Sequence, residues 1–81
     1  MIEIHLNQKV ADPKIRVLSS GVTQLEMNPS VSIDAALDHC SKSLSEDQIQ
    51  QFKLLYTARG IPREFTMDAQ TLVIRLVQDK L

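Results

Sequence analysis

Apolar and polar side chains alternate with a period of two near the start of the chain, over residues 2–6. This spacing is typical of a strand that buries one of its faces. The same alternation recurs over Lys14–Leu18 and Val22–Met27, on either side of a turn-forming segment at 19–21. The sequence therefore predicts one strand and a hairpin, which together form a small N-terminal antiparallel sheet.

The apolar spacing becomes helical after Ser32. Apolar residues recur three, four, seven and eleven positions after Ile33, as one stripe of an α-helix does, and Ser30 or Ser32 supplies the cap. A second helix is expected to begin at the capping box Ser45–Gln48 and to end at Gly60 as a left-handed terminator. Because the connection between the helices is short, we expect an antiparallel helical hairpin.

The C-terminal segment fits two patterns. The alternation of Leu72, Ile74 and Leu76, together with β-branched neighbours, suits a strand that would join the N-terminal sheet as its last element. A helical stripe fits as well and continues toward Leu81 without a turn signal, so we favour a helix. The residues of this stripe are Ala69, Leu72, Val73, Leu76 and Val77.

These elements predict an α+β fold in one small domain over residues 1–81. The N-terminal antiparallel sheet, made of a hairpin plus one strand, is expected to pack against the helical hairpin and the C-terminal helix. A hydrophobic fraction of 43% and a charged fraction of 23% are ordinary for a globular protein. A chain of 81 residues lies near the lower end of the sizes that a single core stabilises, so a partner or a second copy is plausible.

Charge and cysteine content narrow the function classes. The formal net charge is -1 and no segment is basic, which disfavours nucleic-acid binding because that binding depends on neutralising phosphates. No apolar run approaches the ~20 residues of a membrane span, so we expect no membrane association. With Cys40 as the single cysteine, an intrachain disulfide is excluded and a cytoplasmic location fits best. The chain length suits a bacterial or phage protein.

The residues that could carry chemistry do not form a reactive pattern. His39, Cys40 and the distant His5 lack the spacing of a closed zinc site. His39 and Ser43 lie one helical turn apart near Asp38, but no nucleophile-elbow motif accompanies them. We therefore expect no catalytic residues, no metal and no cofactor, and we predict that the protein is not an enzyme.

The sequence leaves protein binding as the favoured function and DNA binding as the alternative. Tyr56, Arg59, Arg63 and Phe65 gather around the expected end of the second helix, and Tyr and Arg are enriched at interface hot spots. This favours a non-enzymatic protein-binding module that acts on a larger protein partner as a small regulator, inhibitor or assembly factor. A self-association surface, giving a homodimer, is expected from the apolar residues of the tail, namely Leu72, Val73, Leu76 and Val77.

The alternative is a small DNA-binding transcriptional regulator. Residues 48–76 hold a helix, a glycine-containing break and the favoured C-terminal helix, in the order of a helix-turn-helix. The break is longer than usual, however, and the candidate recognition helix Met67–Val77 is aliphatic along most of its length. The sequence therefore supports only a degenerate version of this motif.

Overall fold

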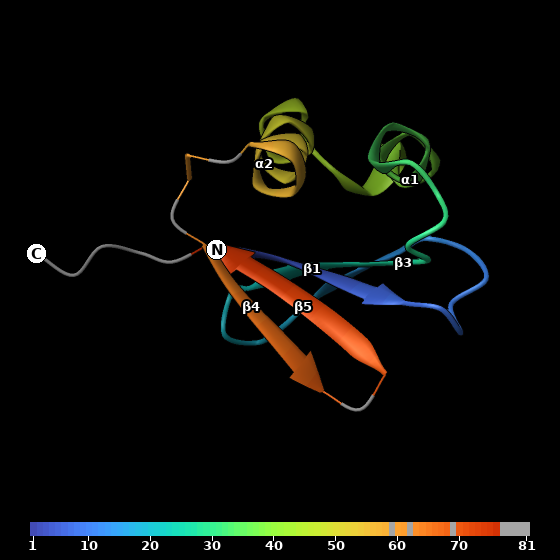
Figure 1. Ribbon diagram of the computed structural model, residues 1–81. Coiled ribbons are helices and arrows are strands. Elements are labelled where there is room, and N and C mark those ends of the chain that lie inside the picture. The colour runs from blue at the N-terminus through green and yellow to red at the C-terminus, as the bar shows by residue number, and fades with distance from the viewer. Residues whose placement is uncertain (59, 62, 69, 77–81) are drawn as a thin grey trace, which may run out of the picture.

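A computed structural model describes residues 1–58, 60–61, 63–68 and 70–76. Figure 1 shows the helices lying together over one face of a sheet, with the other face uncovered. The strands are β1 (Ile2–Asn7), β2 (Lys14–Val17), β3 (Thr23–Met27), β4 (Arg63–Asp68) and β5 (Thr71–Leu76), and the helices are α1 (Ile33–His39), the 3₁₀ helix η1 (Ser41–Ser43) and α2 (Glu46–Thr57).

The described part of the chain forms a five-stranded mixed sheet with the strand order β2-β3-β1-β5-β4. β1 pairs in parallel with β3, and the neighbouring pairs β2–β3, β1–β5 and β4–β5 are antiparallel. The predicted hairpin is present as β2 and β3, with Gly21 at φ 90 in the turn, a conformation that glycine adopts without a steric cost.

The predicted sheet was wrong in its size and in its pairing. A small antiparallel sheet over the N-terminal segment was expected, whereas the sheet is mixed and includes β4 and β5. β3 lies parallel to β1 in a register that brings Ile4 beside Leu25 and Leu6 beside Met27, so both strands present apolar side chains on the face that the helices cover. The short strand β2, with exposed Lys14 and Arg16, is left at the edge.

Both helices begin where their caps predict. The Ser32 hydroxyl accepts a hydrogen bond from the Ala35 amide at 3.1 Å, and Ser45 and Gln48 form a reciprocal capping box at the start of α2. The ends of the helices differ from the prediction. α1 stops at His39 and continues only as η1, and α2 ends at Thr57, before Gly60.

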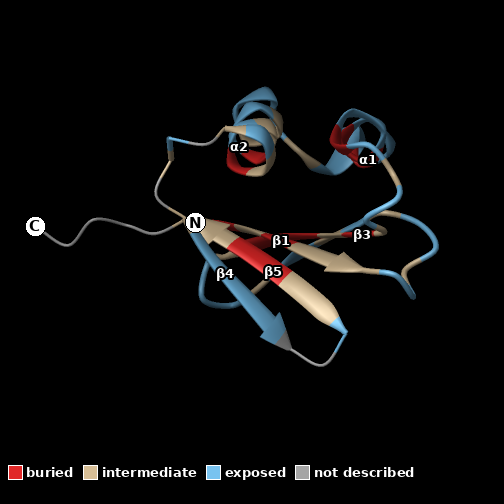
Figure 2. Ribbon diagram, in the orientation of Figure 1, coloured by how far each residue is buried: buried red, intermediate tan, exposed pale blue. Residues whose placement is uncertain are grey.

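The core lies between the helices and the sheet. Figure 2 shows the buried positions on the inner sides of α1 and α2 and on the strands below them. Phe52 of α2 is fully buried in one cluster with Ile4 and Leu25 of the central strands. The other buried members of this cluster are Ile2, Met27, Ile33, Ala36, Leu37, Cys40, Leu55 and Ile74.

The predicted C-terminal helix is wrong, because the described residues of this segment form the antiparallel hairpin β4–β5. β5 lies in the sheet between β1 and β4, with Ile4 opposite Ile74 and Leu6 opposite Leu72. A helix over this segment would leave the central strand β1 without a hydrogen-bonding partner on one side. Pairing with β1 therefore overrides the helical stripe, and the strand alternative is the correct one.

This result removes the structural basis of the helix-turn-helix alternative. The candidate recognition helix ran from Met67 to Val77, but the described residues 67–68 and 71–76 are strand. No helix in the described part of the chain is long and apolar enough to cross a membrane.

Candidate functional site

The β4–β5 hairpin carries apolar side chains beyond the area that the helices cover. On the helix-facing side of the sheet, Phe65 is paired with Ile74, and Met67 is paired with Leu72. Ile74 is buried, whereas Phe65 is 56% exposed and Met67 is 68% exposed. Figure 2 accordingly shows β4 as exposed beside a partly buried β5.

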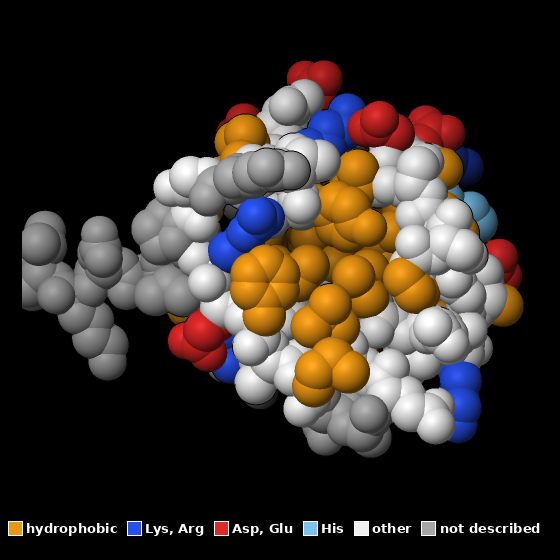
Figure 3. Space-filling view, in the orientation of Figure 1, with side chains coloured by type: hydrophobic (Ala, Val, Ile, Leu, Met, Phe, Trp, Pro, Cys, Tyr) orange, Lys and Arg blue, Asp and Glu red, His pale blue; other side chains and the backbone are white. Residues whose placement is uncertain are grey.

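We define the hairpin patch as Phe65, Met67 and the half-buried Leu72. Its residues continue two apolar rows that cross the sheet from the core. One row runs through Phe65, Ile74, Ile4, Leu25 and Ile15, and the other through Met67, Leu72, Leu6 and Met27. Figure 3 shows the hydrophobic side chains on this side of the molecule as one continuous area. The hairpin patch is thus an exposed extension of the core.

Arg63 connects the first residue of β4 to the end of α2. Its Nη1 donates to the carbonyl of Leu55 at 2.6 Å and approaches the carbonyl of Tyr56 at 3.4 Å. Within the described residues, the last turn of α2 has no basic side chain of its own, so Arg63 supplies the positive charge that a helix C-terminus favours. The same guanidinium lies 5.4 Å from the centre of the Phe65 ring. Phe65 therefore lies beside the side chain that is bonded to the C-terminal end of α2.

The residues predicted to bind a partner therefore do not form one exposed surface. Tyr56 is half-buried and packs against the core, and Arg63 is engaged with α2, so both contribute to the fold. Phe65 is the described member of the set whose side chain is mostly exposed. Arg59 lies outside the described residues.

The residues predicted to support self-association do not share one surface. Leu72 and Leu76 are half-buried on the helix-facing side of β5, whereas Val73 is buried on the opposite side. Val77 lies outside the described residues. These residues would share one face only in a helix, because the side chains of a strand alternate between its two faces.

Sequence reasoning missed Met67, the most exposed residue of the hairpin patch. The signal was present, because residues 63–68 alternate apolar and polar side chains around Phe65 and Met67. The break of the helix-turn-helix interpretation runs from Gly60 to Thr66, and that interpretation assigns no strand to this alternation. Phe65 could be identified as an interface residue from its residue type, and Met67 could have been identified from the two-residue spacing of a strand.

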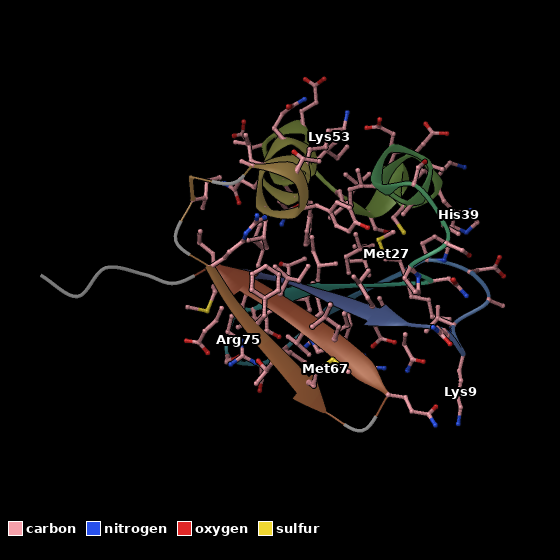
Figure 4. The ribbon with its side chains drawn as sticks, viewed as in Figure 1. Lys9, Met27, His39, Lys53, Met67 and Arg75 are labelled. Atoms are coloured by element: carbon pink, nitrogen blue, oxygen red, sulfur yellow. The ribbon has the colours of Figure 1, made fainter. Side chains whose placement is uncertain are left out.

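The uncovered face of the sheet carries a network of charged and polar side chains around Glu3. Glu3 accepts hydrogen bonds from Gln24 at 2.9 Å and pairs with His5 at 3.0 Å, and its second oxygen lies 3.3 Å from Nε of Arg75. Figure 4 shows Arg75 on the far side of the sheet from the helices. Arg75 also approaches Glu64 of β4 at 3.8 Å. These contacts join β3, β1, β5 and β4.

The network changes the protonation of its central carboxylate. Burial by itself would raise the pKa of Glu3, but the hydrogen bonds from His5 and Gln24 and the charge of Arg75 outweigh it and leave the pKa below its ordinary value. A further pair, between Arg16 and Glu26 at 3.3 Å, extends the pattern to β2. Acidic and basic groups therefore pair across the strands among the residues that the structure describes on this face.

The residues considered for metal or nucleophilic chemistry do not converge. His39 is exposed on α1, as Figure 4 shows, Cys40 is buried beside it, and His5 lies on the uncovered face of the sheet. Burial raises the pKa of the Cys40 thiol, which disfavours the reactive thiolate. Among the described residues, no group of three or more His, Cys, Asp or Glu could hold a metal ion. Asp38 and Ser43 are exposed.

Two shallow hollows flank α2. One, of about 130 Å³, is lined by Leu54, Leu55 and Leu76 together with Ile2, Gln51 and Ile61. The other, of about 160 Å³, lies between the helices, where Lys53 bridges to Asp34 at 3.4 Å. The second hollow is lined by three charged side chains, Asp34, Asp38 and Lys53, but two of these pair with each other, and no charged side chain is among the described residues that line the first hollow. The hairpin patch is therefore the strongest candidate site.

Comparison of the chain with protein-family models, with curated proteins and with solved structures finds no match.

Proposed function

We propose that this protein is a non-enzymatic protein-binding module of the cytoplasm, which regulates, inhibits or helps to assemble a larger protein partner through the hairpin patch. The observation that carries the proposal is the exposure of Phe65 and Met67, at 56% and 68%, as a direct continuation of the core. Aromatic residues and methionine are enriched at protein interfaces, where their burial supplies much of the binding free energy.

The surroundings of the patch support this role. The guanidinium of Arg63, which is bonded to the C-terminal end of α2, lies 5.4 Å from the centre of the Phe65 ring. Phe65 would therefore lose little side-chain freedom on binding. On the uncovered face of the sheet, the described strand residues pair their charges around Glu3 and include no exposed apolar side chain of similar size. The single cysteine, Cys40, is compatible with a reducing compartment.

Capture experiments on matched variants test the proposal. Met67 in β4 and Val17 in β2 are both 68% exposed on the helix-facing side of the sheet, but at opposite edges. Tagged wild-type protein, Met67→Lys and Val17→Lys are expressed in the native host, and the captured proteins are quantified by mass spectrometry. We expect a partner that Met67→Lys loses by roughly tenfold or more, the effect of about 1.4 kcal/mol, and that Val17→Lys retains.

Phe65→Ser provides a second test of the same surface, because it removes the aromatic anchor without adding charge. Each variant must keep the circular dichroism spectrum and thermal midpoint of a folded protein. Equal capture by the wild type, Met67→Lys and Phe65→Ser would exclude the hairpin patch as the binding surface.

A further inference from the structure

β4 is an edge strand of the sheet, and the direction of its backbone groups follows from the hydrogen-bond pattern. The Thr23 amide donates to the Met1 carbonyl at 3.0 Å, so the backbone N–H and C=O groups of the odd-numbered residues of β1 point toward β3. The backbone groups of the even-numbered residues Ile4 and Leu6 therefore point toward β5, where these residues pair with Ile74 and Leu72.

The same alternation extends to the outer edge of the sheet. Because the backbone groups of Ile74 and Leu72 point toward β1, those of the odd-numbered residues of β5 point toward β4. There Val73 pairs with Thr66, and Arg75 pairs with Glu64. It follows that the backbone N–H and C=O groups of Arg63, Phe65 and Met67 point away from the sheet. Among the described residues, nothing continues the sheet beyond them.

The edges of the sheet differ in how they would meet another strand. β2 spans Lys14–Val17, and both Lys14 and Arg16 project to the uncovered face, so an antiparallel copy of β2 would bring basic side chains together. Charged side chains and short length are common protections of an edge strand. β4 is longer, and its helix-facing side presents Phe65 and Met67.

We propose that β4 pairs antiparallel with β4 of a second copy of this chain, with Phe65 at the two-fold axis. The outward backbone groups of β4 belong to odd-numbered residues, which restricts the pairing to registers that match odd with odd. With Phe65 opposite Phe65 of the second copy, Arg63 lies opposite Met67 and Glu64 lies opposite Thr66. Roughly six backbone hydrogen bonds would form across this interface.

Charge selects this register over its neighbours. A register centred on Glu64 would place two glutamates opposite each other, and a register centred on Thr66 would oppose the acidic positions 64 and 68. Like charges in directly opposed positions are destabilising. The register centred on Phe65 opposes no like charges and brings the aromatic rings of the two copies together at the axis.

This pairing would also shape the binding surface, and in that respect it rests on the proposed function. A two-fold axis perpendicular to the sheet keeps both helical layers on the same side of one continuous sheet. Phe65 and Met67 of both copies then form the floor between the two α2 helices. The partner would meet one doubled patch instead of two separate ones.

The first test measures mass in solution by sedimentation and by light scattering over a range of concentrations. We expect the wild type to shift from the mass of one chain to that of two. The Met67 amide faces outward, so Met67→Pro should leave the β4–β5 pairing intact while removing symmetric hydrogen bonds. We expect this variant to raise the dimer dissociation constant by roughly thirtyfold or more, and the control Met67→Ala, which keeps the amide, by less than about tenfold.

The second test reads the register in Cys40→Ala protein and does not depend on the proline variant. In the proposed dimer, residues 64 and 66 form a non-hydrogen-bonded pair with Cα atoms about 4.5 Å apart, within reach of a disulfide. A mixture of Glu64→Cys and Thr66→Cys proteins should therefore cross-link on mild oxidation. Neither protein should cross-link with itself, because its two cysteines would lie about 8 Å apart.

The outcomes separate the proposals. A wild type that stays monomeric at all concentrations, self-linking of either cysteine variant, or open-ended polymers formed by pairing of β4 with β2 would each overturn the dimer. If the protein is monomeric but capture still depends on Met67 and not on Val17, the proposed function stands alone. If the dimer forms but capture ignores Met67, the proposed function fails and the dimer stands.

Discussion

Arg63 offers the sharpest test of how the candidate site is held in place. Its guanidinium donates to the Leu55 carbonyl at 2.6 Å, at a helix end that has no basic side chain in its own described last turn. We expect Arg63→Met, which keeps an unbranched stem, to destabilise the protein by about 1–2 kcal/mol. A hydrogen bond from a charged donor contributes roughly 1.5–3 kcal/mol, and we take the lower part of that range because Arg63 is only half-buried.

This loss is large relative to the whole. A chain of 81 residues has a free energy of unfolding of about 4–12 kcal/mol, at roughly 0.05–0.15 kcal/mol per residue. For a domain of this size, 1 kcal/mol corresponds to a shift of about 4–8 °C in the thermal midpoint. The substitution should therefore be visible in urea unfolding and in thermal melts followed by circular dichroism.

Arg16→Met is the matched control. Arg16 is also an arginine of an edge strand, but its guanidinium is exposed and pairs with the half-buried Glu26 at 3.3 Å, and a pair with such an exposed partner contributes about 0–1 kcal/mol. Hydrogen exchange adds a local readout, because the Ala58 amide that closes α2 donates to the Leu54 carbonyl at 2.9 Å. Equal destabilisation by Arg63→Met and Arg16→Met, with unchanged protection of the Ala58 amide, would refute the role assigned to Arg63.

Two further predictions concern the core and the uncovered face. Phe52 is fully buried, so Phe52→Ala should cost about 3–5 kcal/mol in urea unfolding, and a loss below about 1 kcal/mol would contradict the proposed packing. The folded-state pKa of Glu3 lies below its ordinary value of 4.5, so its stabilisation is complete above that value and is lost as the pH falls through the folded-state pKa. Glu3→Gln should therefore be less stable than the wild type by roughly 1 kcal/mol at neutral pH, and this difference should shrink in acid; a difference that does not change with pH would disprove the network.

Local signals in the sequence were sufficient for the elements that are stabilised locally. The capping box of Ser45 and Gln48 and the Ser32 cap involve residues three positions apart, and the structure confirms both. The alternation in β1 and the turn between β2 and β3 likewise depend on neighbouring residues. The ends of the helices were predicted less well, because the chain leaves α2 at Thr57 to reach β4.

The candidate site was visible only in part. Phe65 and Arg63 were identified by residue type, but the contact of Arg63 with the Leu55 carbonyl joins different elements and has no local pattern. Met67 is exposed because the helical layer does not extend over β4, and the extent of that layer is a property of the assembled fold. The sequence contained the alternation, and the fold decided which side chains stayed uncovered.

The amino-acid sequence by itself determined that this protein combines strands and helices, where the helices begin, and that its charges are balanced. Only the tertiary structure decided that residues 71–76 form a strand, that β1 and β3 run parallel, and that Phe65 and Met67 remain exposed. The physical reason is the range of the interactions. Caps and turns depend on residues a few positions apart, whereas a central strand such as β1 pairs with strands from distant parts of the chain, and those pairings outweigh a local helical preference.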